Sequence, residues 1–277
     1  MIIRQLQPKD CFAAKSLWQE IFQDTEPFAN FFFSRRFTPT LSFGAFDGDE
    51  LVSMALGRRV RMENPLLQTV MISGVSTLPA YRHQGLMTEV LTRLFVNAKR
   101  RGYDLAALSP VDPALYQPFG FVPLTYAIRA SENSAEHPEI METKDPKVLL
   151  HIYQAVCAKH LCMLRREEKD MRLAMEEYRR DDGVFLFAPD EQGYLCYLPE
   201  ANRIEVTECV ALSGQIYRDL LEAAASRSPS GTATADLPTE CGMSGTLIRP
   251  IHALALKEGL ELGTLRHDRR SFCIERY

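Results

Sequence analysis

Hydrophobic and polar residues alternate in two different periods along the first 130 residues. A strand is predicted over 2–6 and a helix over 9–23, where apolar residues recur at helical spacing. Two strand-like runs, 41–46 and 51–60, flank an Asp-Gly dipeptide that is typical of a hairpin turn. A short aromatic-rich helix is expected between the first helix and this hairpin.

The most informative unit is a strand over 69–77, a loop that ends at Gly85, and an amphipathic helix that ends near Gly102. A strand over 104–109 and extended runs over 119–128 follow. The helix is predicted from one apolar stripe, formed by Met87, Val90, Leu91, Leu94, Phe95 and Ala98. This order predicts a mixed α/β sheet flanked by helices.

The second half repeats part of this order. We expect a first domain over 1–130, a linker over 131–146 and a second domain over 147–277, with further strands beyond a Ser/Thr/Pro/Gly-rich stretch at 226–238. Where the repeat would carry its glycine loop, residues 211–215 contain no arginine. The chemistry of the first loop is therefore expected to be missing from the second.

Composition narrows the class of protein. The chain has 277 residues, 46% of them hydrophobic and 25% charged, and 32 basic against 36 acidic residues give a net charge of −4. These values exclude a mainly disordered chain. The slightly negative net charge gives no indication that the protein binds nucleic acid. Seven cysteines without CxxC spacing, and no signal or membrane segment, predict a cytoplasmic protein that does not bind a membrane.

The loop before the long helix is a candidate anion site. A helix N-terminus presents backbone N–H groups without partners, Gly85 lets an anion approach closely, and Arg82 can add a charge-assisted contact. The spacing fits neither a Walker A loop nor a Rossmann fingerprint. The alternative is an exposed turn with a solvated arginine.

The segment 75–87 resembles the acyl-CoA signature of the GNAT superfamily of N-acetyltransferases, in which Arg82-x-x-Gly85 fits the pattern Arg/Gln-x-x-Gly-x-Gly/Ala. Met87 replaces the last Gly or Ala, a departure shared by the enhanced intracellular survival (Eis) type of the family. Downstream, the segment 115–121 resembles the Ile-Tyr-x-x-Phe-Gly-Phe/Tyr motif that follows the fifth strand of that group.

The resemblance implies an α/β (α+β) fold with a splayed central sheet flanked by helices, followed by a degenerate second GNAT-like domain. Eis-type proteins normally end in a sterol-carrier-protein-like domain, and this chain stops near where that domain would begin, around 246–250. The implied activity is acetyl transfer from acetyl-CoA, the cosubstrate, to a primary amine of a small molecule or peptide by direct attack. Eis-type relatives are often oligomeric, so a homo-oligomer is one implied state. A non-catalytic module that binds acyl-CoA is the alternative.

The resemblance also implies roles for individual residues. Val75 and Thr77 would pair with the pantetheine amides, the Val75 N–H would polarise the thioester carbonyl, and Tyr116 would protonate the departing thiolate. For Tyr116 the alternative is core packing. The predicted cofactor-binding residues are Val75, Ser76, Thr77, Arg82, His83, Gln84, Gly85, Leu86 and Met87.

The base that prepares the amine has no obvious source. Residues 70–77 contain no carboxylate. By resemblance to Eis-type enzymes, the C-terminal carboxylate of Tyr277 could reach the active site. Asp24 and Glu26 are alternative anchors for a cationic amine, against simple solvation at the surface.

Two further groups are expected to have no role in catalysis. The arginines at 58, 59 and 61 are interpreted as facing solvent, with a place near the CoA 3′-phosphate as the alternative. Cys157, His160 and Cys162 lie too close together on one helix to close a zinc site without a fourth ligand, so no metal is expected.

Overall fold

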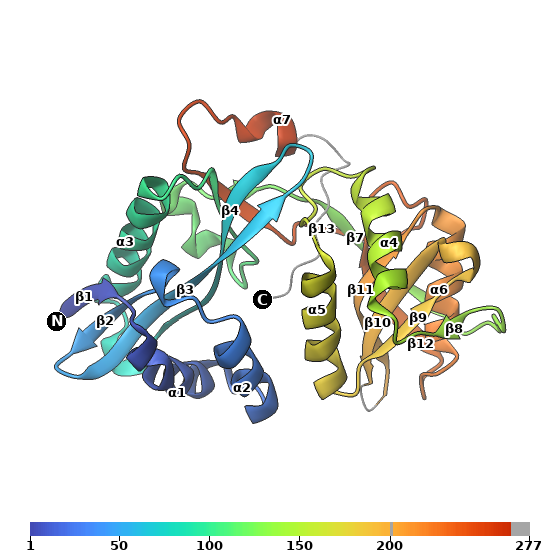
Figure 1. Ribbon diagram of the computed structural model, residues 1–277, viewed down its shortest axis with the longest axis horizontal. Coiled ribbons are helices and arrows are strands. Elements are labelled where there is room, and N and C mark those ends of the chain that lie inside the picture. The colour runs from blue at the N-terminus through green and yellow to red at the C-terminus, as the bar shows by residue number, and fades with distance from the viewer. Residues whose placement is uncertain (200–201, 267–277) are drawn as a thin grey trace.

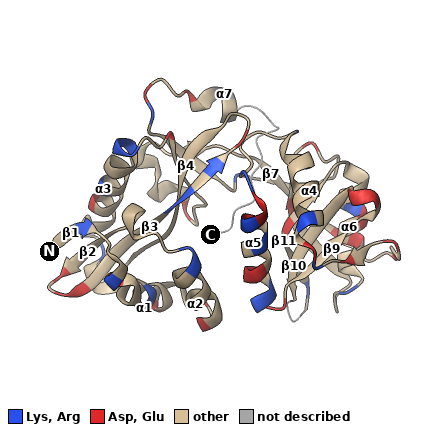
Figure 2. Ribbon diagram, in the orientation of Figure 1, with Lys and Arg blue, Asp and Glu red and all other residues tan. Residues whose placement is uncertain are grey.

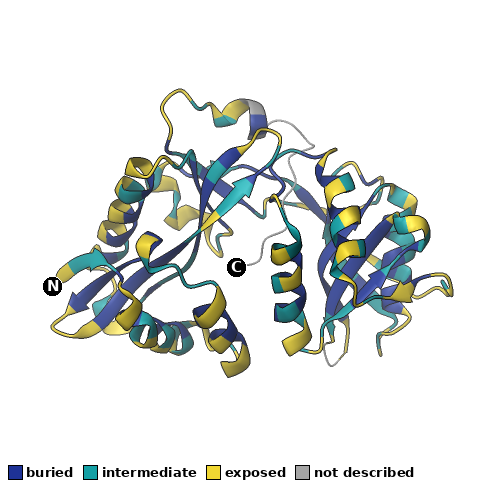
Figure 3. Ribbon diagram, in the orientation of Figure 1, coloured by how far each residue is buried: buried dark blue, intermediate teal, exposed yellow. Residues whose placement is uncertain are grey.

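A computed structural model describes residues 1–199 and 202–266 and shows two sheets of seven strands side by side, each with helices against its faces (Figure 1). Buried positions follow the strands of both sheets and the inner faces of the helices (Figure 3). Within the described residues, no helix combines the length and apolar character that crossing a membrane requires. The α/β class predicted from the periodicity is confirmed.

The first sheet has the strand order β1-β2-β3-β4-β5-β14-β6. Neighbouring strands are antiparallel except β4 and β5, which are parallel and joined by a helix. The strands are β1 (Ile2–Gln5), β2 (Phe43–Asp47), β3 (Glu50–Met62), β4 (Leu67–Thr77), β5 (Leu105–Leu108), β6 (Val122–Pro123) and β14 (His252–Ala255).

Helices cover both faces of this sheet. The apolar stripe of α3 (Leu86–Arg100) packs on one face, where Val90, Leu91 and Leu94 are almost completely buried. On the other face lie α1 (Cys11–Phe22) and α2 (Glu26–Arg35), whose aromatic residues surround Trp18. The helix and hairpin predictions for this half are therefore confirmed.

The second sheet has the order β13-β7-β12-β11-β10-β9-β8. Its helices are α4 (Pro146–Cys157) and α5 (Glu168–Arg180) on one side and α6 (Gly214–Ala225) on the other. A short helix, α7 (Leu262–Arg266), follows the last strand. The strands are β7 (Ala127–Asn133), β8 (Met141–Glu142), β9 (Val184–Phe187), β10 (Gly193–Pro199), β11 (Ile204–Ala211), β12 (Thr232–Leu237) and β13 (Thr246–Ile248).

The two sheets repeat one plan. In each, an antiparallel run leads to a central strand (β4 or β11), a crossover helix (α3 or α6) follows, and a parallel strand (β5 or β12) comes next. The strands expected beyond the stretch 226–238 are present as β13 and β14. β12 lies inside that stretch and was not predicted.

The chain exchanges strands between the sheets. β7 follows the first sheet in sequence but pairs with β12 and β13 of the second, whereas β14 comes near the end of the chain and lies between β5 and β6 of the first. The predicted linker 131–146 includes the end of β7 and all of β8. The two halves are therefore joined by β-sheet hydrogen bonds as well as by the connecting chain. The domain boundaries stay a prediction.

Candidate active site

A V-shaped opening forms where β4 and β5 separate. The two strands pair only at three positions, from Thr69 opposite Leu105 to Met71 opposite Ala107. Beyond Met71, none of the described strands pairs with β4 on that side, although β3 continues along its other edge. The backbone of the last six residues of β4 can therefore hydrogen bond to a ligand in this opening.

A bulge in β4 sits inside the opening. The register with β3 shifts between Met54 and Leu56, and on β4 the extra residues are around Gly74, which has a φ of +58°. A Cβ added there would lie 2.5 Å from the Trp18 ring, so only glycine fits. The Trp18 indole is itself held by a 2.7 Å hydrogen bond from its Nε1 to Asp24. The aromatic cluster around Trp18 thus fixes the backbone just before Val75.

The loop after β4 leads into α3 through a 3-10 turn, Pro79–Tyr81, and two left-handed residues, His83 at φ +60° and Gly85 at φ +79°. Gly85 is the N-cap, and no described side chain caps the helix. Among the residues that the structure describes, no group accepts a hydrogen bond from the amides of residues 83–87. A Cβ at Gly85 would meet no atom within 4 Å. The start of α3 is thus an open, positively polarised seat.

The side chains around this seat leave it accessible. Arg82 is exposed, and its Nε donates a 3.2 Å hydrogen bond to the Thr77 carbonyl, which holds the guanidinium beside the loop. Leu86 is buried and Met87 packs against the hydrophobic cluster beneath α3. Met87 therefore turns its side chain inward, and its amide remains on the side of the loop where an anion would sit.

Two polar side chains of β4 are already engaged. The Ser53 hydroxyl donates to the Ser76 carbonyl at 3.0 Å and lies 2.8 Å from the Thr77 hydroxyl. The Ser76 hydroxyl bonds the Gly74 carbonyl at 3.3 Å. These contacts fix the end of β4 on its β3 side, so the hydroxyls of Ser76 and Thr77 are engaged within the protein.

Tyr116 lies between two 3-10 turns, Pro113–Leu115 and Gln117–Phe119, just beyond β5. Its half-buried ring contacts Phe121 edge to face at 5.8 Å. Tyr116, Val75 and Met87 pack against one hydrophobic cluster, the one that α3 covers. Burial raises the pKa of the Tyr116 phenol. The Tyr116 hydroxyl has no hydrogen-bond partner within the described residues.

The proposed amine anchors are both engaged in local contacts. Asp24 accepts the Trp18 hydrogen bond, and Glu26 is exposed in the first turn of α2, 3.9 Å from Lys15. The role of each as an amine anchor stays a prediction. Tyr277, the third candidate, lies outside the described residues.

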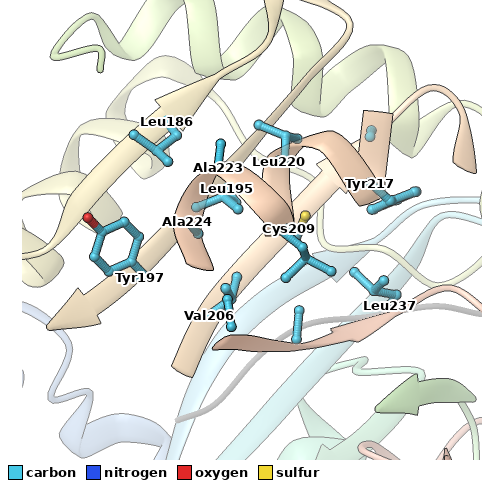
Figure 4. Packing of buried hydrophobic residues seen from close by; sticks show 14 of the residues in the cluster. Leu186, Leu195, Tyr197, Val206, Cys209, Tyr217, Leu220, Ala223, Ala224 and Leu237 are labelled. Carbon is cyan, nitrogen blue, oxygen red and sulfur yellow. The ribbon is translucent and has the colours of Figure 1, made fainter. Parts of the chain in front are cut away.

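The corresponding place in the second half is closed. β11 and β12 pair at only two positions and then separate, as β4 and β5 do. Ser213 caps α6 by accepting a 3.3 Å hydrogen bond from the amide of Ile216. A Cβ at Gly214 would lie 2.0 Å from the Cys241 carbonyl oxygen. Figure 4 shows the space beneath α6 filled by the side chains of Val206, Cys209, Tyr217, Leu220 and Leu237.

A cavity between the two halves was not predicted from the sequence. We call it the interdomain cavity: it has a volume of about 460 Å³ and is lined by Arg35, Arg36 and Thr38, by residues 58–61 of β3, by residues 164–166 and by one face of α5. The expectation that the arginines at 58, 59 and 61 face solvent holds for Arg59, which is exposed. Arg58 and Arg61 are half-buried, and all three line this cavity.

Two groups of possible metal ligands have other structural explanations. Burial raises the pKa of the Cys157 thiol to about 11, so this residue is a thiol rather than a thiolate at neutral pH. Within the described residues, His137, Asp219 and Glu222 have ligand atoms within 4.8 Å of one another. Both ring nitrogens of His137 are already paired, with Glu222 at 2.8 Å and Glu139 at 3.0 Å.

Comparisons with known proteins agree with this geometry. The family described as "Acetyltransferase (GNAT) domain" matches residues 2–124. N-acetyltransferase Eis of Mycobacterium tuberculosis is 34% identical over 85 residues, which span 30% of this chain and only 21% of that relative. Eis1 from Mycobacterium abscessus has a TM-score of 0.68 at 17% identity, covering 92% of this chain and 74% of that chain. A GCN5-related N-acetyltransferase from Anabaena variabilis has a TM-score of 0.73 at 11% identity, covering 92% and 73%.

Proposed function

We propose that this protein is an acetyl-CoA-dependent N-acetyltransferase that acetylates a primary amine of a small molecule or peptide by direct attack, because residues 2–124 match the GNAT acetyltransferase domain. The observation that carries the proposal is the uncapped start of α3 beside the opening between β4 and β5. A diphosphate fits there because the amides of residues 83–87 have no partner in the described chain and the space at Gly85 is open.

Different residues around the start of α3 would bind different parts of acetyl-CoA. The amides of residues 83–87 and the Arg82 guanidinium would hold the diphosphate, and the free edge of β4 would pair with the pantetheine amides. Bound acetyl-CoA supplies an activated acetyl group as a thioester. The Val75 N–H, oriented by the Gly74 bulge, would donate to the carbonyl oxygen as negative charge develops there.

Tyr116 is the proposed general acid. Burial raises its pKa, so the phenol remains protonated at neutral pH. Because a thiol has a pKa of about 8.5, below that of the phenol, Tyr116 would hydrogen bond to the departing thiolate and share its proton as the C–S bond breaks, and the phenolate would regain a proton from water. The attacking amine must first lose a proton, and β4 offers no carboxylate for this step. We assign the deprotonation to water or to the C-terminal carboxylate of Tyr277, which lies outside the described residues.

Two measurements test the proposal. Isothermal titration calorimetry should show one acetyl-CoA site per chain, and absence of binding would end the account. Thiol release from acetyl-CoA, measured against amines of different charge, should increase when a suitable acceptor is added. Tight binding without transfer to any amine would favour an acyl-CoA-binding module that performs no chemistry.

A further inference from the structure

The interdomain cavity has an unusual excess of positive charge. Its lining includes seven arginines and Lys169, against two carboxylates, Asp170 and Glu177. Figure 2 shows these basic segments facing one another at the end of α2, along β3 and at the start of α5. Most of these cations already have a carboxylate partner: Arg61 and Lys169 pair with Glu167, and Arg165 pairs with Glu63, in addition to the pairs described below.

Ion pairs at the edge of the cavity hold several of these cations in position. Arg36 pairs with Glu177, and Arg35 lies 3.2 Å from Glu176, so two pairs connect α2 with α5. Each guanidinium has five N–H donors, and one carboxylate partner leaves some of them available to a ligand. The pairs therefore preorganise the arginines without using up their capacity to bind an anion.

Arg166 is held most firmly. Its side chain is 11% exposed and makes two 2.7 Å hydrogen bonds to Glu208, and its guanidinium stacks on the Tyr153 ring at 4.4 Å. Tyr194 also donates to Glu208, which fixes the carboxylate. The second half thus contributes one firmly positioned guanidinium group to the cavity wall, held by residues of its own core.

Arg59 is the most available cation. It is exposed, forms no ion pair with residues of the ranges 1–199 and 202–266, and makes one 3.3 Å hydrogen bond to Gln68. The first turn of α5 also reaches the cavity wall through Lys169 and Asp170, but its N-terminus is closed by a capping box between Glu167 and Asp170. The guanidinium groups, and not the helix dipole, are therefore the groups that would attract an anion.

The cavity and the opening lie on either side of β4. β3 lines the cavity and pairs with one edge of β4, and Arg58 is paired there with Met71, the residue at which the other edge of β4 leaves β5. Val75 lies four residues further along β4, or about 13 Å at the usual rise per residue, less the shortening caused by the bulge. An acceptor held in the cavity would have to span at least this distance to reach the acyl group.

We propose that the interdomain cavity binds the acceptor by an anionic group, a phosphate or a carboxylate, carried on the same small molecule as the reactive amine. The inference rests on the acetyltransferase function proposed above and adds the class of acceptor. The guanidinium groups hold the anion, and the amine extends along β4 toward the Val75 amide. Polyamines and other polycations are excluded by the same charges.

The test compares matched acceptors. Aminoalkyl phosphates of increasing chain length, the corresponding amino acids and the corresponding aminoalkanols would be offered with saturating acetyl-CoA, and spermidine would be included as a polycation. We expect kcat/KM for the preferred anionic series to exceed that for the aminoalkanols by at least about tenfold, the scale of one charge-assisted contact. The chain-length optimum reports the distance from anion to amine, and the better series identifies phosphate or carboxylate.

A pair of variants locates the site. Arg59→Gln should raise KM for the anionic acceptor about fivefold to tenfold and leave kcat/KM for the aminoalkanols unchanged. Arg100→Gln is the matched control, because Arg100 is an exposed arginine at the far end of α3 and outside the cavity. Calorimetry with CoA already bound should show the aminoalkyl phosphate binding to the wild type and to Arg100→Gln, and more weakly to Arg59→Gln.

The outcomes separate the two proposals. If aminoalkanols or spermidine are acetylated as well as the anionic amines, the inference is wrong and the acetyltransferase function stands. The inference also fails if both variants behave alike. If acetyl-CoA does not bind, the proposed function fails, and the assignment of the cavity as an acceptor site fails with it.

Discussion

The two halves of the chain share one plan and differ at the start of the crossover helix. In the first, α3 begins at Gly85 with free amides and open space; in the second, α6 begins at Ser213, which caps the helix, and Gly214 lies against the Cys241 carbonyl. Both halves separate their parallel strands beyond the last pair. The fold therefore does not create an anion site by itself; the residues of one loop decide it.

The second half contributes part of its surface to the interdomain cavity. The face of α5 that includes Lys169, Asp170 and Glu177 forms a wall of the interdomain cavity, opposite β3 of the first half. Under the proposal above, the second half supplies this face to the acceptor side of the site in the first half. The exchanged strands β7 and β14 keep the two halves joined while they do so.

The largest effect should come from closing the open loop. Gly85→Asp places a carboxylate among the amides and should weaken acetyl-CoA binding by about 100-fold or more, since it removes two or more charge-assisted contacts. Aspartate tolerates a positive φ better than most residues. Calorimetry would measure the affinity.

Gly102→Asp is the matched control for this change. Gly102 has a φ of +77° and open space around its Cα, like Gly85, but stands at the other end of α3. Equal losses of affinity in both variants would mean that helix stability, and not the seat at Gly85, controls binding.

The second largest effect should be on the acyl-transfer step and not on acetyl-CoA binding. Tyr116→Phe should lower kcat by about 100-fold, the lower range for a general acid, with the affinity for acetyl-CoA unchanged. Tyr103→Phe is the control, because Tyr103 is half-buried against the same cluster and burial also raises its pKa. A kcat for Tyr116→Phe close to that of the control would show that Tyr116 only packs.

A smaller effect is expected from the arginine that distinguishes the two loops. Arg82→Ala should weaken acetyl-CoA binding about tenfold, because one charge-assisted contact is lost while the amides remain. Arg218→Ala provides the comparison in the second half: Arg218 lies in α6 and pairs with Glu132 at 3.5 Å. Its affinity for acetyl-CoA should equal that of the wild type, and a similar loss there would place the ligand at the wrong helix.

The smallest effect is expected from a substitution at the start of α6, where Ser213 caps the helix. Ser213→Ala removes the N-cap of α6 and should lower the free energy of unfolding by about 1 kcal/mol without changing acetyl-CoA binding. Urea unfolding and calorimetry on one preparation would measure both quantities. Weaker acetyl-CoA binding in this variant would show that the second loop also takes part in holding the ligand.

Local patterns in the sequence predicted the elements near the site. The apolar stripe of α3 and the turn at Gly85 are signals within one segment, and the structure places them as expected. β12 was missed because its buried residues include Ala233 and Ala235, which are too small to stand out among the surrounding Ser, Thr and Gly. The exchange of β7 and β14 has no local signal, because it depends on pairing between distant strands.

The interdomain cavity was missed for a related reason. The arginines of β3 look like solvent-facing residues when only their own strand is considered. Their environment is set by α5, more than 100 positions later in the chain, and by the end of α2. Charge that is distributed over separate segments becomes a site only when the fold brings those segments together.

The most direct test of the account is a crystal structure of the protein with CoA bound. We predict that the diphosphate lies against the amides of residues 83–87, that the pantetheine follows the free edge of β4, and that the start of α6 at Ser213 holds no nucleotide. A diphosphate at α6, or a ligand that leaves the loop at Gly85 empty, would contradict the central claim.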